Sequence, residues 1–162
     1  EEGWIIALSR GVYDQNGEVD LGLKRLIGHA ASWSAGCLYC RAHTGTSALR
    51  HGVSPQKLAD LPNYRSSPLF SEAERAAIDF AHAAGTQPNA VDDALFAELR
   101  RHWSEAAVVE ILGVVGLFGF FNRWNDSMAT TLEPEPLEQA RQHLAAAGWT
   151  PGKHEPAPPI SE

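Results

Sequence analysis

The sequence predicts an all-α protein with a single domain. Apolar residues recur at helical spacing through most of the chain, good helix N-caps precede several of these stretches, and no stretch alternates apolar and polar residues in the manner of a strand. The length of 162 residues is enough for one domain with one substantial core.

The first elements surround a cysteine-containing stretch that runs from Leu23 to Gly45. A short helix is predicted from Trp4 to Val12, and the turn-forming residues 13–17 end it. Asp20 is a good N-cap for a second helix, which is interrupted at residues 34–36 (Ser-Ala-Gly). A third helix is expected to start at Cys37 and to stop at residues 51–52, where a glycine follows a histidine.

The middle of the chain carries two further helix starts. Ser54, followed by a proline, opens a short helix that ends by residue 62, and residues 62–69 form a loop by composition. Ser71 and Glu74 have the spacing of a capping box, which predicts a helix that stops at Gly85. Another helix is expected from Val91 to Trp103.

Ser104 caps the longest predicted helix, from Ala106 to about Asn125. Its middle is apolar nearly all round, so we expect it to be the central buried helix. Three of its glycines recur every three residues and would allow a neighbouring helix to pack closely: Gly113, Gly116 and Gly119.

The end of the chain divides into a last helix and a tail. The helix is predicted from Leu137 to Ala147, ending at a glycine. Residues 1–150 would then form one helical domain, and residues 151–162, with four prolines, an extended or disordered tail.

Composition excludes some classes of function. The net charge is −7 and no Lys/Arg cluster occurs, which argues against a nucleic-acid partner. The longest apolar run, Val114 to Phe121, is shorter than the ~20 residues of a membrane span, so we expect a soluble, cytoplasmic chain with no membrane partner. Two cysteines this close in sequence cannot staple a fold, which favours redox chemistry or metal binding.

Cys37 and Cys40 form a Cys-x-x-Cys pair at a predicted helix start. Free N–H groups and the helix dipole at that end favour a thiolate and so lower a thiol pKa. Residues three apart on a helix are neighbours, so the pair can close a disulfide once one sulfur has been oxidised. This spacing suits a dithiol cycle and needs no cofactor.

The run from Gly36 to Thr44 (GCLYCRAHT), the capping box at Ser71 and the Asn122-Arg123 pair resemble the alkylhydroperoxidase D / carboxymuconolactone decarboxylase family over roughly residues 23–125. The resemblance implies an all-α fold assembled into trimers or hexamers, with a dimer as a further option. It also implies an organic hydroperoxide substrate and a partner dithiol reductant. By resemblance Cys40 attacks the peroxide and the more accessible Cys37 resolves it, whereas the dipole argument favours Cys37 as the attacking thiol.

Two positions depart from the family pattern. Thr44 stands where the family usually has a histidine, and Arg25 stands where its redox branch has a glutamate of a proton relay. His43, in the motif, and His29, one helical turn beyond Arg25, are the candidates for handling protons. Glu110 is a third candidate, since burial would raise the pKa of this carboxylate; an ion pair with an arginine such as Arg123, or with one from another subunit, is the alternative. Arg25 could lower a thiol pKa by its charge.

The sequence leaves four functions open. The first is a thiol-dependent alkyl hydroperoxide reductase that uses Cys37 and Cys40. The second is a carboxymuconolactone decarboxylase-like lyase, which would rely on acid–base residues. The third is a metal site on Cys37, Cys40 and His43, which lacks the fourth ligand of a closed zinc site. The fourth is a redox-sensing or binding homologue that has lost catalysis.

The remaining histidines are expected to be solvated: His51, His82, His102, His143 and His154.

Overall fold

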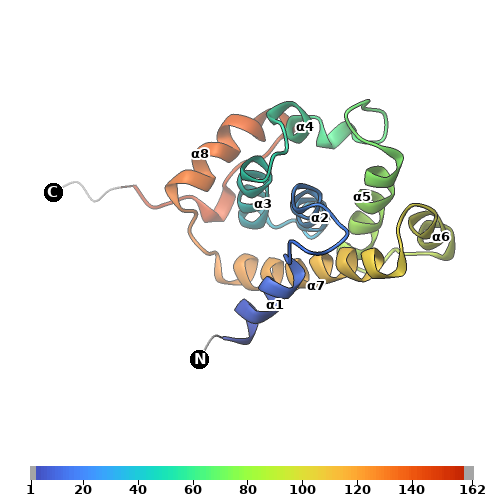
Figure 1. The fold of residues 1–162 in the computed structure, drawn as a ribbon. Coiled ribbons are helices and arrows are strands. Elements are labelled where there is room, and N and C mark those ends of the chain that lie inside the picture. The colour runs from blue at the N-terminus through green and yellow to red at the C-terminus, as the bar shows by residue number, and fades with distance from the viewer. Residues whose placement is uncertain (1–2, 159–162) are drawn as a thin grey trace.

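The computed structural model describes residues 3–158 and is helical, with no strand in that range (Figure 1). The predicted all-α fold is therefore confirmed. Three short 3-10 turns, η1 (Leu61–Asn63), η2 (Ala145–Ala147) and η3 (Gly152–His154), supplement the α-helices. The α-helices are α1 (Trp4–Val12), α2 (Leu21–Ser34), α3 (Leu38–Arg50), α4 (Pro55–Ala59), α5 (Glu72–Gly85), α6 (Asp93–His102), α7 (Glu105–Met128) and α8 (Pro134–His143).

Side-chain caps set the helix starts where the sequence predicts them. Asp20, Ser54 and Ser104 each accept a hydrogen bond from a backbone N–H in the first turn. Ser71 and Glu74 form the complete capping box at the start of α5. The last helix begins earlier than predicted, because Pro134 is well suited to a first turn, and it ends at His143.

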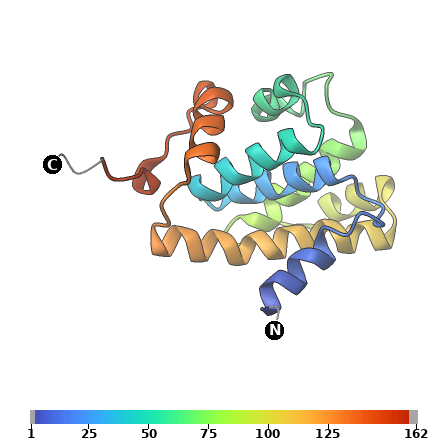
Figure 2. The ribbon, with the colours of Figure 1, turned by 60° about the vertical axis from the view of Figure 1, so that its left-hand side comes forward.

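The central helix of the fold is α2, and the expectation that the long apolar helix would be central is wrong. Most residues of α2 are buried, and α3, α5 and α7 all pack against it (Figure 1). Figure 2 shows α7 running along one side of the molecule beneath α2 and α3. The composition of α7 predicts burial on all sides, but the side that faces away from α2 is covered only in part, by the short helix α1.

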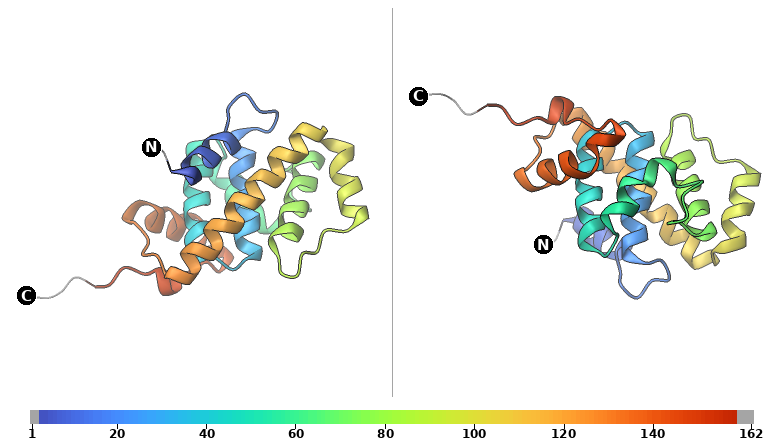
Figure 3. Two further views of the ribbon diagram at one scale, coloured as in Figure 1. Left: turned by 90° about the horizontal axis from the view of Figure 1, so that it is seen from below. Right: turned by 90° about the horizontal axis from the view of Figure 1, so that it is seen from above.

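The outer face of α7 remains apolar and exposed. Val109 is 70% exposed, and Leu112, Trp124 and Met128 are also exposed; α1 crosses this face (Figure 3). By length and composition α7 could cross a membrane, unlike the shorter run considered from sequence. Core helices of soluble proteins meet the same criterion, so this observation is weak evidence for a membrane span.

Close helix packing occurs at glycines other than those predicted. A Cβ on Gly116 would meet no atom within 4 Å, and one on Gly113 would make only ordinary contact with Val12. By contrast, a Cβ on Gly85 would lie 2.9 Å from backbone atoms of Ala31, and one on Gly28 would lie 2.6 Å from the Phe118 ring. These two glycines therefore let α5 and α7 approach the central helix closely.

The described part of the tail is partly folded, which corrects the expectation of an extended or disordered segment. The η3 turn places His154 in the protein interior, where it is fully buried rather than solvated, and its carbonyl accepts from the Leu132 N–H at 2.9 Å. Lys153 pairs with Asp126 at 3.0 Å and Arg141 with Glu155 at 2.7 Å. The end of the predicted tail, residues 159–162, lies outside the described residues.

Candidate active site: a buried dithiol beside an aromatic pocket

The two cysteines lie at the N-terminus of α3, and both are free thiols. Cys37 is the N-cap of the helix, and its sulfur accepts a hydrogen bond from the Cys40 backbone N–H at 3.3 Å. Both side chains are buried, Cys37 completely and Cys40 with 2% exposure. The greater accessibility of Cys37 that the family resemblance implied is therefore wrong for this chain.

The thiols are electrostatically coupled, and their pKa values move in opposite directions. The Cys40 thiol donates a hydrogen bond to the Cys37 sulfur, which lowers the pKa of Cys37 despite burial, with help from the Cys40 backbone N–H. The same hydrogen bond, burial and the Cys37 charge raise the pKa of Cys40. The negative charge of the pair therefore rests on Cys37, as the helix-start argument predicts.

Cys40, and not Cys37, lines a pocket of about 640 Å³ between α1, α3 and α7. Asn125 contributes an amide whose Nδ2 lies 3.8 Å from the Cys40 sulfur and donates to it. This hydrogen bond favours a thiolate at Cys40. The remaining lining is mainly aromatic and apolar: Trp4, Ile5, Tyr39, His43, Phe118, Phe120, Phe121 and Trp124.

His43 lies at the edge of this pocket and is held by a carboxylate that sequence analysis did not identify. Its Nε2 is 2.7 Å from Oε2 of Glu133, at the start of α8, and the Tyr39 hydroxyl donates to the other oxygen at 2.9 Å. The Tyr39 and His43 rings lie 4.4 Å apart. A histidine oriented by a carboxylate in this way can take up or release a proton at the pocket edge.

His29 is separated from the pocket that Cys40 lines. The ring is completely buried in α2, its Nδ1 lies 3.0 Å from Thr44 Oγ1, and its Nε2 has no hydrogen-bond partner among the described residues. Burial lowers the pKa of His29 to about 3, with a further contribution from the positive charge of Arg41. The ring is therefore neutral at ordinary pH, and the structure does not bring it together with His43.

The carboxylate of Glu110 is engaged in contacts that stabilise the fold. Partial burial acts to raise its pKa, but hydrogen bonds from Lys24, Glu18 and Val19 outweigh that effect, so the pKa of Glu110 is lowered. This corrects the expectation of a raised pKa. Its ion-pair partner is Lys24 at 2.8 Å, not an arginine, and Lys24 is 1% exposed.

The Arg25 side chain contacts an aromatic ring. Its guanidinium lies 3.5 Å from the centre of the Tyr13 ring, and this contact links the end of α1 to α2. Arg25 also lines a second groove that includes His43 and Thr44. The charge that acts on both thiols is that of Asp126, and it raises their pKa values.

Within residues 3–158 no group of three or more His, Cys, Asp or Glu side chains is placed to hold a metal ion. The His43 nitrogen that could complete a site with the two cysteines is engaged by Glu133. The chemistry that this donor set supports is that of a dithiol with a nearby proton carrier.

Comparison with known proteins places this architecture in a family. The profile of the carboxymuconolactone decarboxylase family matches residues 3–83, half of the chain. The crystal structure of the apo debrominase Bmp8 superposes with a TM-score of 0.80 at 34% identity, covering 85% of this chain and 74% of that one. The chain belongs to the carboxymuconolactone decarboxylase family.

Three further similar proteins extend the comparison. A cysteine-to-alanine variant of Bmp8 with 2,3,4-tribromopyrrole bound is similar to this chain with a TM-score of 0.80 at 33% identity, over 85% of this chain and 73% of that one. A protein of unknown function from Agrobacterium tumefaciens, proposed to be the antioxidant defence protein AhpD, gives a TM-score of 0.69 at 26% identity, with 76% and 84% covered. The uncharacterised Escherichia coli protein YnjA is 36% identical over 92 residues, which span 57% of this chain but only half of YnjA.

Proposed function

We propose that this chain is a thiol-dependent reductase that passes two electrons from Cys37 and Cys40 to a substrate held in the aromatic pocket. The observation that carries the proposal is that Cys40 is the sulfur that lines the pocket, while Cys37 lies behind it and carries the charge of the pair. Cys40 is then the attacking atom, and Cys37 is both its base and the resolving thiol.

An organic hydroperoxide is the first substrate class. The Cys40 sulfur attacks the terminal peroxide oxygen, the O–O bond breaks, and the Cys40 proton passes to the Cys37 sulfur. The products are a sulfenic acid on Cys40 and an alkoxide, which takes a proton at the pocket edge from His43 or water. Cys37 then attacks the sulfenic sulfur, and its proton leaves with the hydroxide as water. The disulfide is reduced by an external dithiol.

A brominated aromatic substrate is the second candidate, favoured by the ring-rich pocket wall and by the likeness to a debrominase. The overall step consumes one thiol, one thiolate and one carbon–bromine bond. It yields the disulfide, bromide and a carbon–hydrogen bond. This reaction would use the same two cysteines and the same external dithiol as the peroxide reaction.

The test is a thiol count on the fully reduced chain before and after one equivalent of cumene hydroperoxide or, separately, 2,3,4-tribromopyrrole. We expect both thiols to be lost and the protein mass to fall by two hydrogens, with bromide released in the second case. The Cys40→Ser variant should consume neither compound. Cys37→Ser should consume one equivalent and retain an oxidised Cys40. Persistence of both thiols with both compounds would refute the proposal.

For the assembly, we propose a homo-oligomer in which the exposed face of α7 packs on a second copy. The apolar side chains Val109, Leu112 and Met128 on that face support this proposal.

A further inference from the structure

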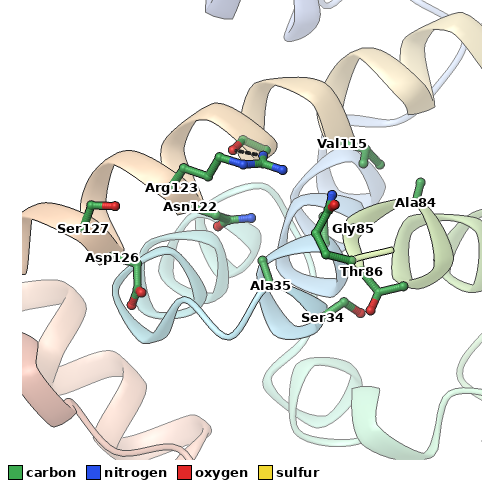
Figure 4. Close-up of a pocket in the computed structure, with 13 residues that line it drawn as sticks. Ser34, Ala35, Ala84, Gly85, Thr86, Val115, Asn122, Arg123, Asp126 and Ser127 are labelled. Atoms are coloured by element: carbon green, nitrogen blue, oxygen red, sulfur yellow. Dashed lines mark hydrogen bonds between the residues drawn. The ribbon is translucent and has the colours of Figure 1, made fainter. Parts of the chain in front are cut away.

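A second cavity, distinct from the aromatic pocket, opens between α2, α5 and α7 (Figure 4). Its volume is about 360 Å³, near the lower end of the ~300–1,000 Å³ range of small-molecule sites. No residue lines both this cavity and the aromatic pocket. The lining is polar on several sides, with side chains that include Ser34, Thr86, Gln87, Asn122, Arg123 and Asp126.

Asn122 lies in the wall of this polar cavity, and its side-chain oxygen Oδ1 has no hydrogen-bond partner among the described residues. It is 4% exposed, and its Oδ1 is completely buried. Burying an amide oxygen without a partner costs free energy. A buried oxygen acceptor in a cavity wall is therefore available to a ligand that donates a hydrogen bond.

The end of α5 adds acceptors to the same cavity. Ala84, Gly85 and Thr86 line it, and the Thr86 N–H makes no capping hydrogen bond to the last turn, unlike the cap residues of α2 and α3. The last carbonyls of a helix carry the negative end of its dipole and attract a cation. The Asp126 carboxylate lies at the opposite side, where it also pairs with Lys153 at 3.0 Å.

Arg123 supplies a positive group to the same cavity. Its Nη1 donates to the Gly119 carbonyl at 2.7 Å within α7, and no carboxylate among the described residues pairs with it. A guanidinium offers five donors in a planar fork, so most of its capacity remains for a ligand carboxylate. The cavity thus combines hydrogen-bond acceptors with one unpaired cation.

We propose that this cavity binds a free α-amino acid. The ammonium group would donate to Asn122 Oδ1 and to the acceptors at the end of α5, and the carboxylate would pair with Arg123. A simple amine would be repelled by Arg123 and a simple acid by Asp126, whereas a zwitterion satisfies both ends. The site does not depend on the chemistry of the dithiol.

The experiment uses the whole chain and the twenty proteinogenic L-amino acids, tested singly by saturation-transfer NMR and then by calorimetry. We expect at least one to bind. The N-acetyl form of that amino acid, which lacks the ammonium, and its methyl ester, which lacks the carboxylate, should each bind at least about tenfold more weakly. Equal binding of either derivative, or no binding of any amino acid at about 10 mM, would overturn the proposal.

Two variants test the assigned contacts. Arg123→Gln should weaken binding at least about tenfold, whereas Arg100→Gln, on the exposed surface of α6, should leave it unchanged. Asn122→Leu should raise the melting temperature of the free protein and abolish ligand binding, because it removes a buried amide oxygen that has no partner among the described residues. A lower melting temperature with binding retained would show that Asn122 is structural and would refute its role. The double Cys37→Ser, Cys40→Ser variant should bind normally, so failure of the proposed reductase does not decide this test.

Discussion

The hydroxyl of Thr44 connects the buried ring of His29 to the backbone of the cysteine motif. Thr44 Oγ1 lies 3.0 Å from His29 Nδ1 and within 2.8 Å of the Cys40 carbonyl oxygen. Burial of the imidazole, with the positive charge of Arg41 nearby, keeps His29 neutral between α2 and α3, and its Nε2 has no partner among the described residues. The contact joins the central helix to the helix that carries the dithiol.

The neutral His29 predicts acid sensitivity. Its pKa is about 3 in the folded chain and about 6.5 when unfolded, so between these values the unfolded chain binds the extra proton. The free energy of unfolding should therefore fall as pH drops through that window, by about 2 kcal/mol between pH 6.5 and 4.5 from this residue. Urea denaturation of the wild type and of His29→Gln at several pH values measures the contribution.

His143→Gln is the matched control, since its ring lies on the surface helix α8 and should leave the pH profile unchanged. If the wild type and His29→Gln lose stability equally on acidification, buried His29 is not the cause.

Glu110 is expected to act in folding and not in catalysis. It holds the N–H groups of Glu18 and Val19 and neutralises the buried Lys24. Glu110→Gln should lower the free energy of unfolding by about 3 kcal/mol, because it leaves a buried ammonium without its counter-charge. Thiol consumption per folded chain should not change. Glu98→Gln, on the surface of α6, should leave the free energy of unfolding nearly unchanged. A tenfold loss of turnover in folded Glu110→Gln would reinstate a catalytic role.

Only part of the site follows from the sequence. The cysteine pair, the caps Asp20 and Ser104 and the helix order are local features, and a local pattern predicts them. Glu133 reaches His43 from 90 residues away, so no spacing rule could pair them. An acidic residue at a helix start beside two prolines was the available signal, but it indicates a cap as readily as a site.

The burial of individual side chains is the other property that cannot be predicted from the sequence alone. The composition of α7 suggests an interior helix, but which face is covered depends on neighbours distant in the chain. Lys24 and His154 are polar residues in the interior. Each is stabilised there by a specific oxygen atom: Lys24 by the Glu110 carboxylate and His154 by the Thr130 carbonyl. Their types alone predict exposure.

The dithiol should ionise in two widely separated steps. The first thiolate, on Cys37, should form below the ordinary thiol pKa of about 8.5, and the second only at strongly alkaline pH. Thiolate absorbance followed against pH measures both steps. The Cys37→Ser variant should lose the low step, whereas Cys40→Ser should keep it with a modest upward shift. A single step at the ordinary pH for both thiols would contradict the coupling.

The His43–Glu133 pair should assist departure of the alkoxide. If His43 supplies a proton at the pocket edge, His43→Gln should lower kcat with cumene hydroperoxide by about 100-fold. Glu133→Gln should have a smaller effect in the same direction. Tyr39→Phe is the control, because it removes the other hydrogen bond to Glu133 and leaves the imidazole in place. Equal kcat values in all four proteins would exclude His43 as the acid.

The outer face of α7 predicts self-association. Leu112 is half exposed in an apolar face and would be buried by a second copy. Leu112→Glu should therefore reduce the solution mass measured by light scattering, while Glu105→Gln at the exposed start of the same helix should not. A monomeric wild type would show that this face has another use.

Because Cys37 caps α3, the reduction potential of the cysteine pair depends on a hydrogen bond at the start of that helix. In the reduced state the Cys37 sulfur accepts the Cys40 N–H at the helix start, and a thiolate is a far better acceptor than a disulfide sulfur. Oxidation therefore removes a stabilising interaction that reduction restores. A dithiol stabilised in this way has a disulfide that is a comparatively strong oxidant. In the proposed cycle, regeneration would then be thermodynamically easy even for a mild cellular reductant.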